Sequence, residues 1–305
     1  MKNLNWKAVL PYVVAIVSFI CISMLYCSPA LEGKVLVQGD INTWKGAAHE
    51  AQTFYEEHGY SPWWTNSMFG GMPTYQITGG LPSGEFRGTL EEIFRAGFSG
   101  DFAIIGVIFA YFFGFFLMLR CFKVNVWLSI IGGLAIGFSS YFFLIIPAGH
   151  MTKAVALGFL APIIGGFHAI FQKRYWLGGP LVLLYGMLGL VMHPQMTFYM
   201  FMFIGILALT ELYVHAKEKR WKDFGISIGV FVFCLLLVFG TKASWFEMNQ
   251  SYLKETMRGG HSELTKENVD KNKSAGLDLD YATAWSYGVG ETMTLLIPNW
   301  EGGAS

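Results

Sequence analysis

The chain has 305 residues, of which 53% are hydrophobic, 17% aromatic and only 14% charged. This composition, with a mean hydropathy of +0.43, lies outside the range of ordinary soluble domains and is typical of an integral membrane protein. Because the 21 basic and 21 acidic residues balance, no global positive field favours nucleic acid as a partner. The position of each charge along the chain therefore carries more information than the total.

Seven apolar runs are long enough to cross a hydrocarbon core of about 30 Å, which takes roughly 17 to 25 helical residues. They predict an all-α polytopic membrane protein with about seven spans. The first run is too long for the apolar core of a typical signal peptide, so it is expected to remain as a span. The runs are Trp6–Tyr26, Phe102–Phe122, Val126–Ile146, Ala154–Phe171, Trp176–Met192, Thr197–Val214 and Phe224–Ser244.

Basic residues mark every second connection between these runs. They are Lys2, Lys7, Arg120, Lys123, Lys173, Arg174, Lys217, Lys219, Arg220 and Lys222. Since Lys and Arg are enriched on the cytoplasmic side, the N terminus is predicted to be cytoplasmic in a bacterial inner membrane. Residues 1–244 would then form a transmembrane bundle whose large first loop, 27–101, lies on the outer, periplasmic face. The tail, 245–305, also falls on that face and ends without a closing span, as expected for the N-terminal part of a longer protein.

The first outer loop has its own predicted organisation. Apolar residues at helical spacing predict an amphipathic interfacial helix over Thr43–Gly59 and a second one over Thr89–Phe98. Between them, "SPWWTNSMFGGMPTYQITGGLPSG" is rich in Gly, Pro and aromatic residues and predicts a compact ordered loop. Trp63 and Trp64 in this loop suit either an interfacial anchor or a ligand groove.

Asp40 is the first candidate for chemistry. It lies in "VQGDINTWKGAAHE", between the first span and the predicted interfacial helix. A carboxylate there could act as a general base that takes a proton from an acceptor hydroxyl. The alternative is that it caps the following helix, a position for which Asn42 or Thr43 is better placed.

Two further polar groups fall on the same predicted face as Asp40. His150 and Lys153 flank the start of the fourth span, where charged donors beside a helix start could hold a phosphate or diphosphate leaving group. His193 and Gln195 belong to "HPQ", a polar island at the start of the sixth span. Ordinary loop polarity is the alternative for both groups.

The other ionisable residues of the spans have simpler interpretations. His168 is expected to be a packed, hydrogen-bonded core residue, and Glu211 and His215 a solvated edge one helical turn apart. The four cysteines have no metal-ligand or redox spacing and are expected to be small packing residues. No Walker-type loop, GxGxxG after a strand, HExxH or GxSxG occurs, so ATP hydrolysis is not expected and a lipid-linked activated donor is the reasonable energy source.

The order of these pieces resembles a known family. "GDINTW", "PWWTNSMFGGMPTYQ" and "WSYGVGETMTLLIPNWEGG", separated by the apolar spans, resemble the YfhO-like bacterial membrane proteins of the Bacteroidetes type. That family belongs to the GT-C class of membrane glycosyltransferases. The resemblance covers essentially the whole chain, and its most specific pieces are Trp64–Tyr75 and Glu291–Asn299.

The resemblance implies a GT-C transmembrane bundle that moves a sugar from a polyprenyl-phosphate donor to a cell-envelope glycan or lipid acceptor at the outer face. Asp40 matches the catalytic carboxylate expected early in the first loop. The donor phosphate would be held by His150, Lys153 and His193, and the substrate would be contacted by Trp63, Trp64 and Gln195. Some members bind a divalent metal through an acidic pair, whereas Asp40 stands alone, so the cofactor requirement stays open.

Two other classes of function remain open from the sequence. One is a transporter or flippase for a lipid-linked envelope precursor, and the other is a non-catalytic envelope-assembly protein that kept the fold. Transport is disfavoured because the spans contain few ionisable residues and show no paired charges at mid-membrane, where coupling sites usually lie.

Overall fold

The protein is described by a computed structural model that divides into two units, Met1–Thr241 and Lys242–Ser305. Each unit is described here by itself. The residues that the structure describes are 5–77, 91, 93–98, 100–253, 256, 283, 284, 286, 288–297, 300 and 301.

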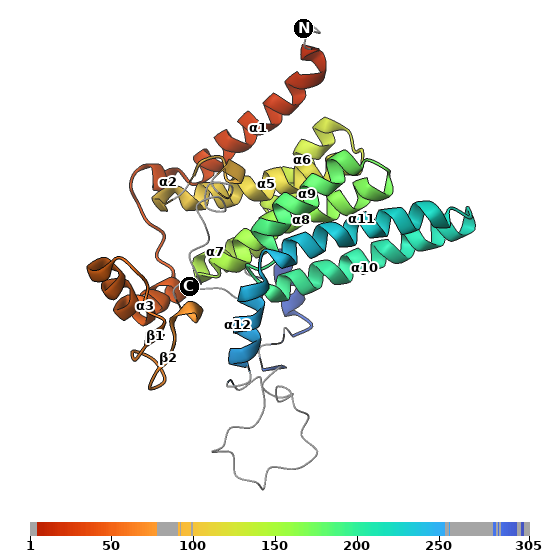
Figure 1. Ribbon diagram of the computed structural model, residues 1–305. Helices are drawn as coiled ribbons and strands as arrows, with labels where there is room; N and C mark the ends of the chain where they lie inside the picture. The colour runs from red at the N-terminus through yellow and green to blue at the C-terminus, as the bar shows by residue number, and fades with distance from the viewer. Residues whose placement is uncertain are drawn as a thin grey trace. The chain divides into compact units, whose positions relative to one another are not determined.

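The first unit is almost entirely helical (Figure 1). The one β pair among its described residues is antiparallel, with Trp64 opposite Pro73 and Thr65 opposite Met72. The elements are α1 (Trp6–Tyr26), α2 (Ser28–Leu31), α3 (Gly39–His58), β1 (Trp64–Thr65), β2 (Met72–Pro73), η1 (Thr74–Gln76), η2 (Gly100–Phe102), α5 (Ala103–Cys121), α6 (Val126–Gly137), α7 (Ser140–Ala148), α8 (Met151–Phe171), α9 (Tyr175–Gly189), α10 (Pro194–Lys217) and α11 (Trp221–Gly240).

The apolar helices are those of a polytopic all-α membrane protein. In the described part of the chain five helices, α1, α5, α8, α10 and α11, are long and apolar enough to cross a bilayer, and α6 with α7 makes a sixth span if the bent pair counts as one. Helix α9 has 15 residues, which corresponds to about 22 Å at 1.5 Å per residue. The predicted span Trp176–Met192 therefore corresponds to a helix too short to cross a core of about 30 Å on its own.

The predicted third span, Val126–Ile146, is broken in the middle. Helices α6 and α7 meet at an angle of 45°. The break falls at Gly137 and Ser139, where Ser139 is extended, and Gly/Ser pairs are common sites of helix kinks. A Cβ atom on Gly137 would lie 2.3 Å from Cδ1 of Phe112, so the close packing of α6 on α5 also requires glycine here.

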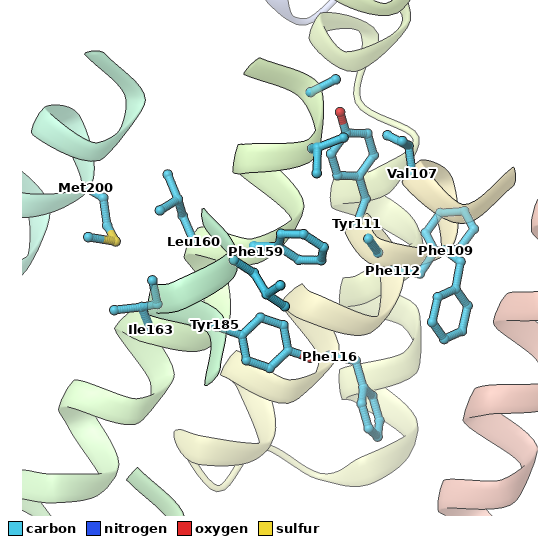
Figure 2. Packing of buried hydrophobic residues seen from close by; sticks show 14 of the residues in the cluster. Val107, Phe109, Tyr111, Phe112, Phe116, Phe159, Leu160, Ile163, Tyr185 and Met200 are labelled. Carbon is cyan, nitrogen blue, oxygen red and sulfur yellow. The ribbon is translucent and has the colours of Figure 1, made fainter. Parts of the chain in front are cut away.

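Helices α5 and α8 form the centre of the bundle and approach each other through small residues. A Cβ atom on Gly114 of α5 would lie 2.2 Å from the backbone oxygen of Gly158 on α8. Small residues are the usual means by which membrane helices pack closely, because apolar burial between helices gives little gain in lipid. The aromatic residues of the core surround this contact, with Phe159 of α8 and Tyr185 of α9 6.0 Å apart between ring centroids (Figure 2).

The turns at one end of the bundle bring three of the predicted basic connections together. Lys123 Nζ donates to Gln172 Oε1 at 2.9 Å, and Lys173 Nζ lies 2.7 Å from Asp223 Oδ2. Lys123, Lys173 and Lys219 each follow the last turn of a helix and have positive φ angles, between 56° and 60°. We call this the basic end of the bundle. The alternation of charge along the sequence predicts that these turns lie at the same end.

The helix predicted over Thr43–Gly59 begins earlier than expected. Helix α3 starts at Gly39 instead of Thr43 and ends at His58, and the next residue, Gly59, has a φ of 77°, the left-handed conformation common after helices. The Asn42 backbone N–H already donates to the Gln38 carbonyl, so Gln38 is the N-cap residue. Of the second predicted helix, Thr89–Phe98, the described residues Glu91, Ile93 and Phe94 are helical, and the others up to Leu90 lie outside the described residues.

The second unit is described in short pieces. Helix α12 runs from Ala243 to Leu253, and a 3-10 helix, η3, from Glu291 to Leu295. The Glu291 carboxylate accepts a hydrogen bond from the Gly288 backbone N–H at 2.7 Å, which fixes the turn before η3. Most of the polar part of the predicted tail lies outside the described residues.

Candidate functional site

The start of α3 contacts the turn between α7 and α8. The Gln38 side chain donates to the Ile146 carbonyl oxygen at 2.5 Å. Gly149, in that turn, has a φ of 98°, and a Cβ atom on it would lie 2.9 Å from Cβ of Asp40. Glycine is therefore required twice at this position, by the backbone conformation and by the close approach of α3.

Because of this contact, Asp40 lies close to His150, one of the predicted phosphate-binding residues. His150 Nδ1 lies 3.2 Å from Asp40 Oδ2. The two side chains are 47% and 62% exposed, so the pair can be reached by a substrate and contributes little to stability. Two residues that are more than a hundred positions apart in the sequence thus form one polar pair.

The helix-capping interpretation of Asp40 needs correction. Asn42 and Thr43, the better-placed caps in the sequence, lie inside α3, and Thr43 Oγ1 donates to the Gly39 carbonyl instead of accepting from a free backbone N–H. Asp40 itself lies in the first turn of the helix, where a carboxylate interacts favourably with the helix dipole. It makes no side-chain cap, so its pairing with His150 is its main polar contact among the described residues.

His193 joins the same end of the bundle as the N-cap residue of α10. Its pKa is lowered, first by burial of the ring and then by the positive charges of Lys153 and His150. The Nδ1 atom is buried and has no hydrogen-bond partner among the described residues. At neutral pH His193 is therefore expected to offer a neutral hydrogen bond to a ligand, with the charge supplied by Lys153.

An open cavity of about 650 Å³ lies near this group, although Asp40, His150, Lys153 and His193 are not among its lining residues. Gln38, Ile41 and Asn42, on both sides of Asp40, line it, as do Pro147 and Met151 on both sides of His150. The rest of the wall comes mainly from apolar residues of α2, of the segment 34–37 and of the ends of α1, α5 and α7, with Lys34, Lys45 and Asp101 as the charged members. The cavity therefore offers an apolar surface next to polar and charged groups.

The predicted substrate-contacting residues are placed less centrally. Trp63 and Trp64 are both exposed, and the Trp64 ring covers Gly71, on which a Cβ atom would lie 2.8 Å from the indole. Gln195 Nε2 donates to the Tyr199 hydroxyl at 2.8 Å on the exposed side of α10. Among the described residues, no hydrogen bond or ion pair joins any of the three to Asp40 or His150.

The loop that carries Trp63 and Trp64, residues 61–77, is held on α3 by a largely exposed hydrogen-bond network that the sequence did not reveal. The Glu50 carboxylate accepts hydrogen bonds from the Thr65 hydroxyl and from the Asn66 backbone N–H, the latter at 3.1 Å. Ser67 Oγ donates to the Ala47 carbonyl at 3.1 Å, and the Trp44 indole donates to the Ile77 carbonyl. These contacts confirm a compact ordered loop over the part of the segment that the structure describes.

The loop is expected to loosen when Glu50 loses its charge. The Thr65 hydroxyl, followed by the backbone N–H groups of Asn66 and Ser67, lowers the pKa of Glu50. Because the pKa is lowered on folding, the carboxylate stabilises the loop above its ordinary pKa of 4.5, and this is lost as the pH falls through the lowered value. Glu50→Gln imitates the protonated side chain, so hydrogen exchange of residues 63–77 should become faster at neutral pH.

Glu57→Gln is the matched control, because Glu57 is an exposed acid on the same helix and contacts no residue of the loop in the described structure. Unchanged protection of residues 63–77 in Glu50→Gln would show that the network does not hold the loop.

Comparisons with family models, with curated proteins and with solved structures gave no match. Among the described residues no group of three His, Cys, Asp or Glu side chains is arranged to hold a metal ion.

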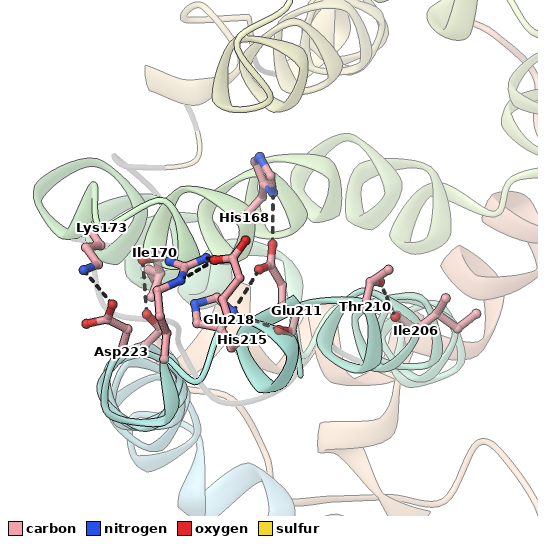
Figure 3. A network of polar contacts seen from close by, with 11 residues as sticks. His168, Ile170, Lys173, Ile206, Thr210, Glu211, His215, Glu218 and Asp223 are labelled. Carbon is pink, nitrogen blue, oxygen red and sulfur yellow. Dashed lines mark hydrogen bonds and ion pairs between the residues drawn. The ribbon is translucent and has the colours of Figure 1, made fainter. Parts of the chain in front are cut away.

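At the basic end, the structure contradicts one expectation from the sequence and adds a contact to another. His168 is packed as expected, with its ring stacked on Phe122 at 4.1 Å between centroids, and its Nδ1 atom also lies 3.8 Å from Glu211 Oε1 (Figure 3). Glu211 and His215, expected to form a solvated edge, are largely shielded, and the His215 side chain is only 2% exposed. Helical spacing correctly paired Glu211 with His215 but could not show that α8 covers them.

Proposed function

We propose that the protein is a membrane glycosyltransferase of the GT-C class. It would move a sugar from a polyprenyl-phosphate donor to a cell-envelope acceptor on the outer face of a bacterial inner membrane. The observation that carries the proposal is the pairing of Asp40 with His150 at 3.2 Å beside a cavity that is mostly apolar. The resemblance to the YfhO-like family adds the reaction class.

In this proposal Asp40 is the general base. The acceptor hydroxyl oxygen attacks the anomeric carbon of the donor sugar, and its proton passes to the Asp40 carboxylate. The bond between that carbon and the phosphate oxygen breaks, and polyprenyl phosphate leaves. His150, whose Nδ1 atom contacts Asp40, orients the carboxylate toward the acceptor.

The leaving phosphate gains negative charge in the transition state, so a fixed positive charge beside it lowers the barrier. Lys153 supplies that charge, with His193 as a neutral donor, because burial of the ring, and after it the nearby positive charge of Lys153, lowers the pKa of His193. The apolar wall of the cavity accommodates the isoprenoid units next to the phosphate.

The proposal is tested with purified protein in liposomes supplied with polyprenyl-phosphate sugars carrying a labelled sugar. Release of polyprenyl phosphate by transfer to water gives a readout that does not depend on knowing the acceptor. Labelled product or free sugar should form at a rate above that of protein-free liposomes. A protein that moves the intact donor between leaflets without breaking its glycosidic bond would show the transporter alternative instead.

One observation favours the transporter alternative. Glu211, inside the apolar helix α10, contacts His215 on the same helix and also His168 on α8, a pairing of ionisable groups between helices that the sequence did not predict. These groups lie in the last two turns of α10, whereas coupling sites of transporters usually lie near the middle of the membrane. We therefore favour the enzyme.

His150 and Lys153 are expected to affect different kinetic constants. Because His150 Nδ1 is occupied by Asp40, His150→Ala should lower kcat about tenfold with little change in the donor KM. Lys153→Ala should mainly raise the donor KM, because it removes a charge that binds phosphate before and during reaction. Steady-state kinetics with one donor distinguishes these effects.

His150→Asn keeps a side-chain N–H near the position of Nδ1 and should retain more activity than His150→Ala. A rise in the donor KM with unchanged kcat in His150→Ala would instead make His150 a phosphate ligand.

A further inference from the structure

A second cavity, of about 420 Å³, lies at the basic end of the bundle between the ends of α8, α10 and the start of α11. Glu211 and His215 line it together with Lys173 and Arg220, and Phe171, Gln172 and Val214 complete the wall. The proposed transfer reaction uses none of these residues. We call this second cavity the inner polar cavity.

His215 has a buried nitrogen that no protein group satisfies. Its Nδ1 atom lies 2.8 Å from the backbone carbonyl oxygen of Glu211. A carbonyl oxygen can only accept, so Nδ1 carries the hydrogen, and in the neutral ring Nε2 is then an acceptor. Nε2 is buried without a hydrogen-bond partner in the described structure. Buried polar atoms are nearly always hydrogen-bonded in native proteins, so this atom points to an absent partner.

The Glu211 carboxylate also keeps free capacity to accept hydrogen bonds. The rings of His168 and His215 approach its oxygens at 3.8 and 3.6 Å, which are ion-pair distances but too long for hydrogen bonds (Figure 3). The two residues that carry these unsatisfied acceptors, Glu211 and His215, both line the cavity. A ligand group with N–H donors and a positive charge fits these acceptors best.

The opposite chemistry lines the same cavity. Lys173 lies 2.7 Å from Asp223, and Arg220 contacts Glu218, but both pairs are partly exposed to solvent and can exchange for a stronger anion. At this end of the bundle, further basic residues lie next to Lys173 and next to Arg220 in the sequence. Basic pockets between membrane helices on the cytoplasmic side of a membrane bind phosphate head groups of lipids.

We propose that the inner polar cavity binds the head group of an aminophospholipid, with its phosphate on Lys173 and Arg220 and its ammonium group on Glu211 and His215. The ligand class follows from the two kinds of wall, because a phosphodiester and an N–H-bearing ammonium must lie next to each other. Phosphatidylethanolamine has both groups. Phosphatidylcholine has the same charges but no N–H donor, and phosphatidylglycerol has no positive charge.

The test uses the full-length chain in detergent, titrated with each of the three lipids and followed by native mass spectrometry and thermal unfolding. The wild type should bind phosphatidylethanolamine about tenfold more tightly than phosphatidylcholine, the effect of one charged hydrogen bond. His215→Asn keeps a donor to the Glu211 carbonyl but lacks Nε2, and Glu211→Gln removes the charge, so both should abolish the preference. Lys217→Gln, an exposed basic residue outside the cavity wall, should keep it.

Equal affinity of the wild type for the three lipids would overturn the proposal. Retained preference in Glu211→Gln and His215→Asn would place the lipid elsewhere. If free phosphoethanolamine raises the unfolding temperature as much as the lipid does, the occupant is a soluble phosphate compound and the membrane source is wrong. None of these measurements depends on sugar transfer.

Discussion

Replacing Asp40 with Asn should lower the rate of sugar transfer by about 10²- to 10⁴-fold, the usual contribution of a general base. Asn keeps the size of the side chain and can still contact His150 Nδ1 through its amide oxygen, but it cannot take a proton from an acceptor hydroxyl. The effect should fall on kcat, because the donor is held by its phosphate and lipid. The measurement is the release of polyprenyl phosphate by purified protein in liposomes.

Glu57→Gln removes one negative charge from the exposed end of the same helix and should leave the rate unchanged. Thermal unfolding of Asp40→Asn should also match the wild type, because an ion pair as exposed as that of Asp40 and His150 contributes at most about 1 kcal/mol. An unchanged transfer rate in Asp40→Asn, in protein that is folded, would refute Asp40 as the base and with it the proposed mechanism.

The second large effect is expected at the contact between α5 and α8. The added methyl group of Gly114→Ala would lie 2.2 Å from the Gly158 backbone oxygen and 3.4 Å from Cδ of Pro162. Backbone cannot rotate away as a side chain can, so the two helices must separate. Overpacking of this kind costs about 1–3 kcal/mol or more, and we expect a lower yield of folded protein and a lower unfolding temperature.

Gly205→Ala is the matched control, because Gly205 also lies inside an apolar helix but has no atom within 4 Å of an added Cβ. There the substitution should be neutral or stabilise the protein by about 0.5–1 kcal/mol, since alanine favours helix more than glycine does. Equal unfolding temperatures for Gly114→Ala and Gly205→Ala would mean that α5 and α8 do not pack as described.

Much of the fold could be predicted from the sequence because apolar length is a local property. Each of the seven predicted runs contains an apolar helix or, at residues 126–148, a helix pair. The break between α6 and α7 could not be predicted, because it depends on how closely Gly137 packs on Phe112 of another helix. The short length of α9 could not be predicted either, because the residues at which a helix begins and ends are the least certain part of a prediction from sequence.

The candidate site, too, could be predicted only in part from the sequence. The alternation of basic connections placed Asp40 and His150 on one face, and the structure brings them to 3.2 Å. The start of α3 four residues before the predicted one changed the capping argument, because Gln38 is the N-cap residue and not Asn42. The contact of His168 with Glu211 depends on which face of α8 meets α10, and hydropathy along a single chain carries no such information.

The three lysine turns at the basic end have a consequence for how the chain enters the membrane. Lys123, Lys173 and Lys219 adopt a left-handed backbone conformation that costs a non-glycine residue roughly 1–2 kcal/mol. Glycine would remove that cost, but it would also remove a positive charge, and Lys and Arg in short loops favour the cytoplasmic side during insertion. At these turns the chain thus accepts a small loss of stability in the folded state and keeps charges of the kind that direct insertion.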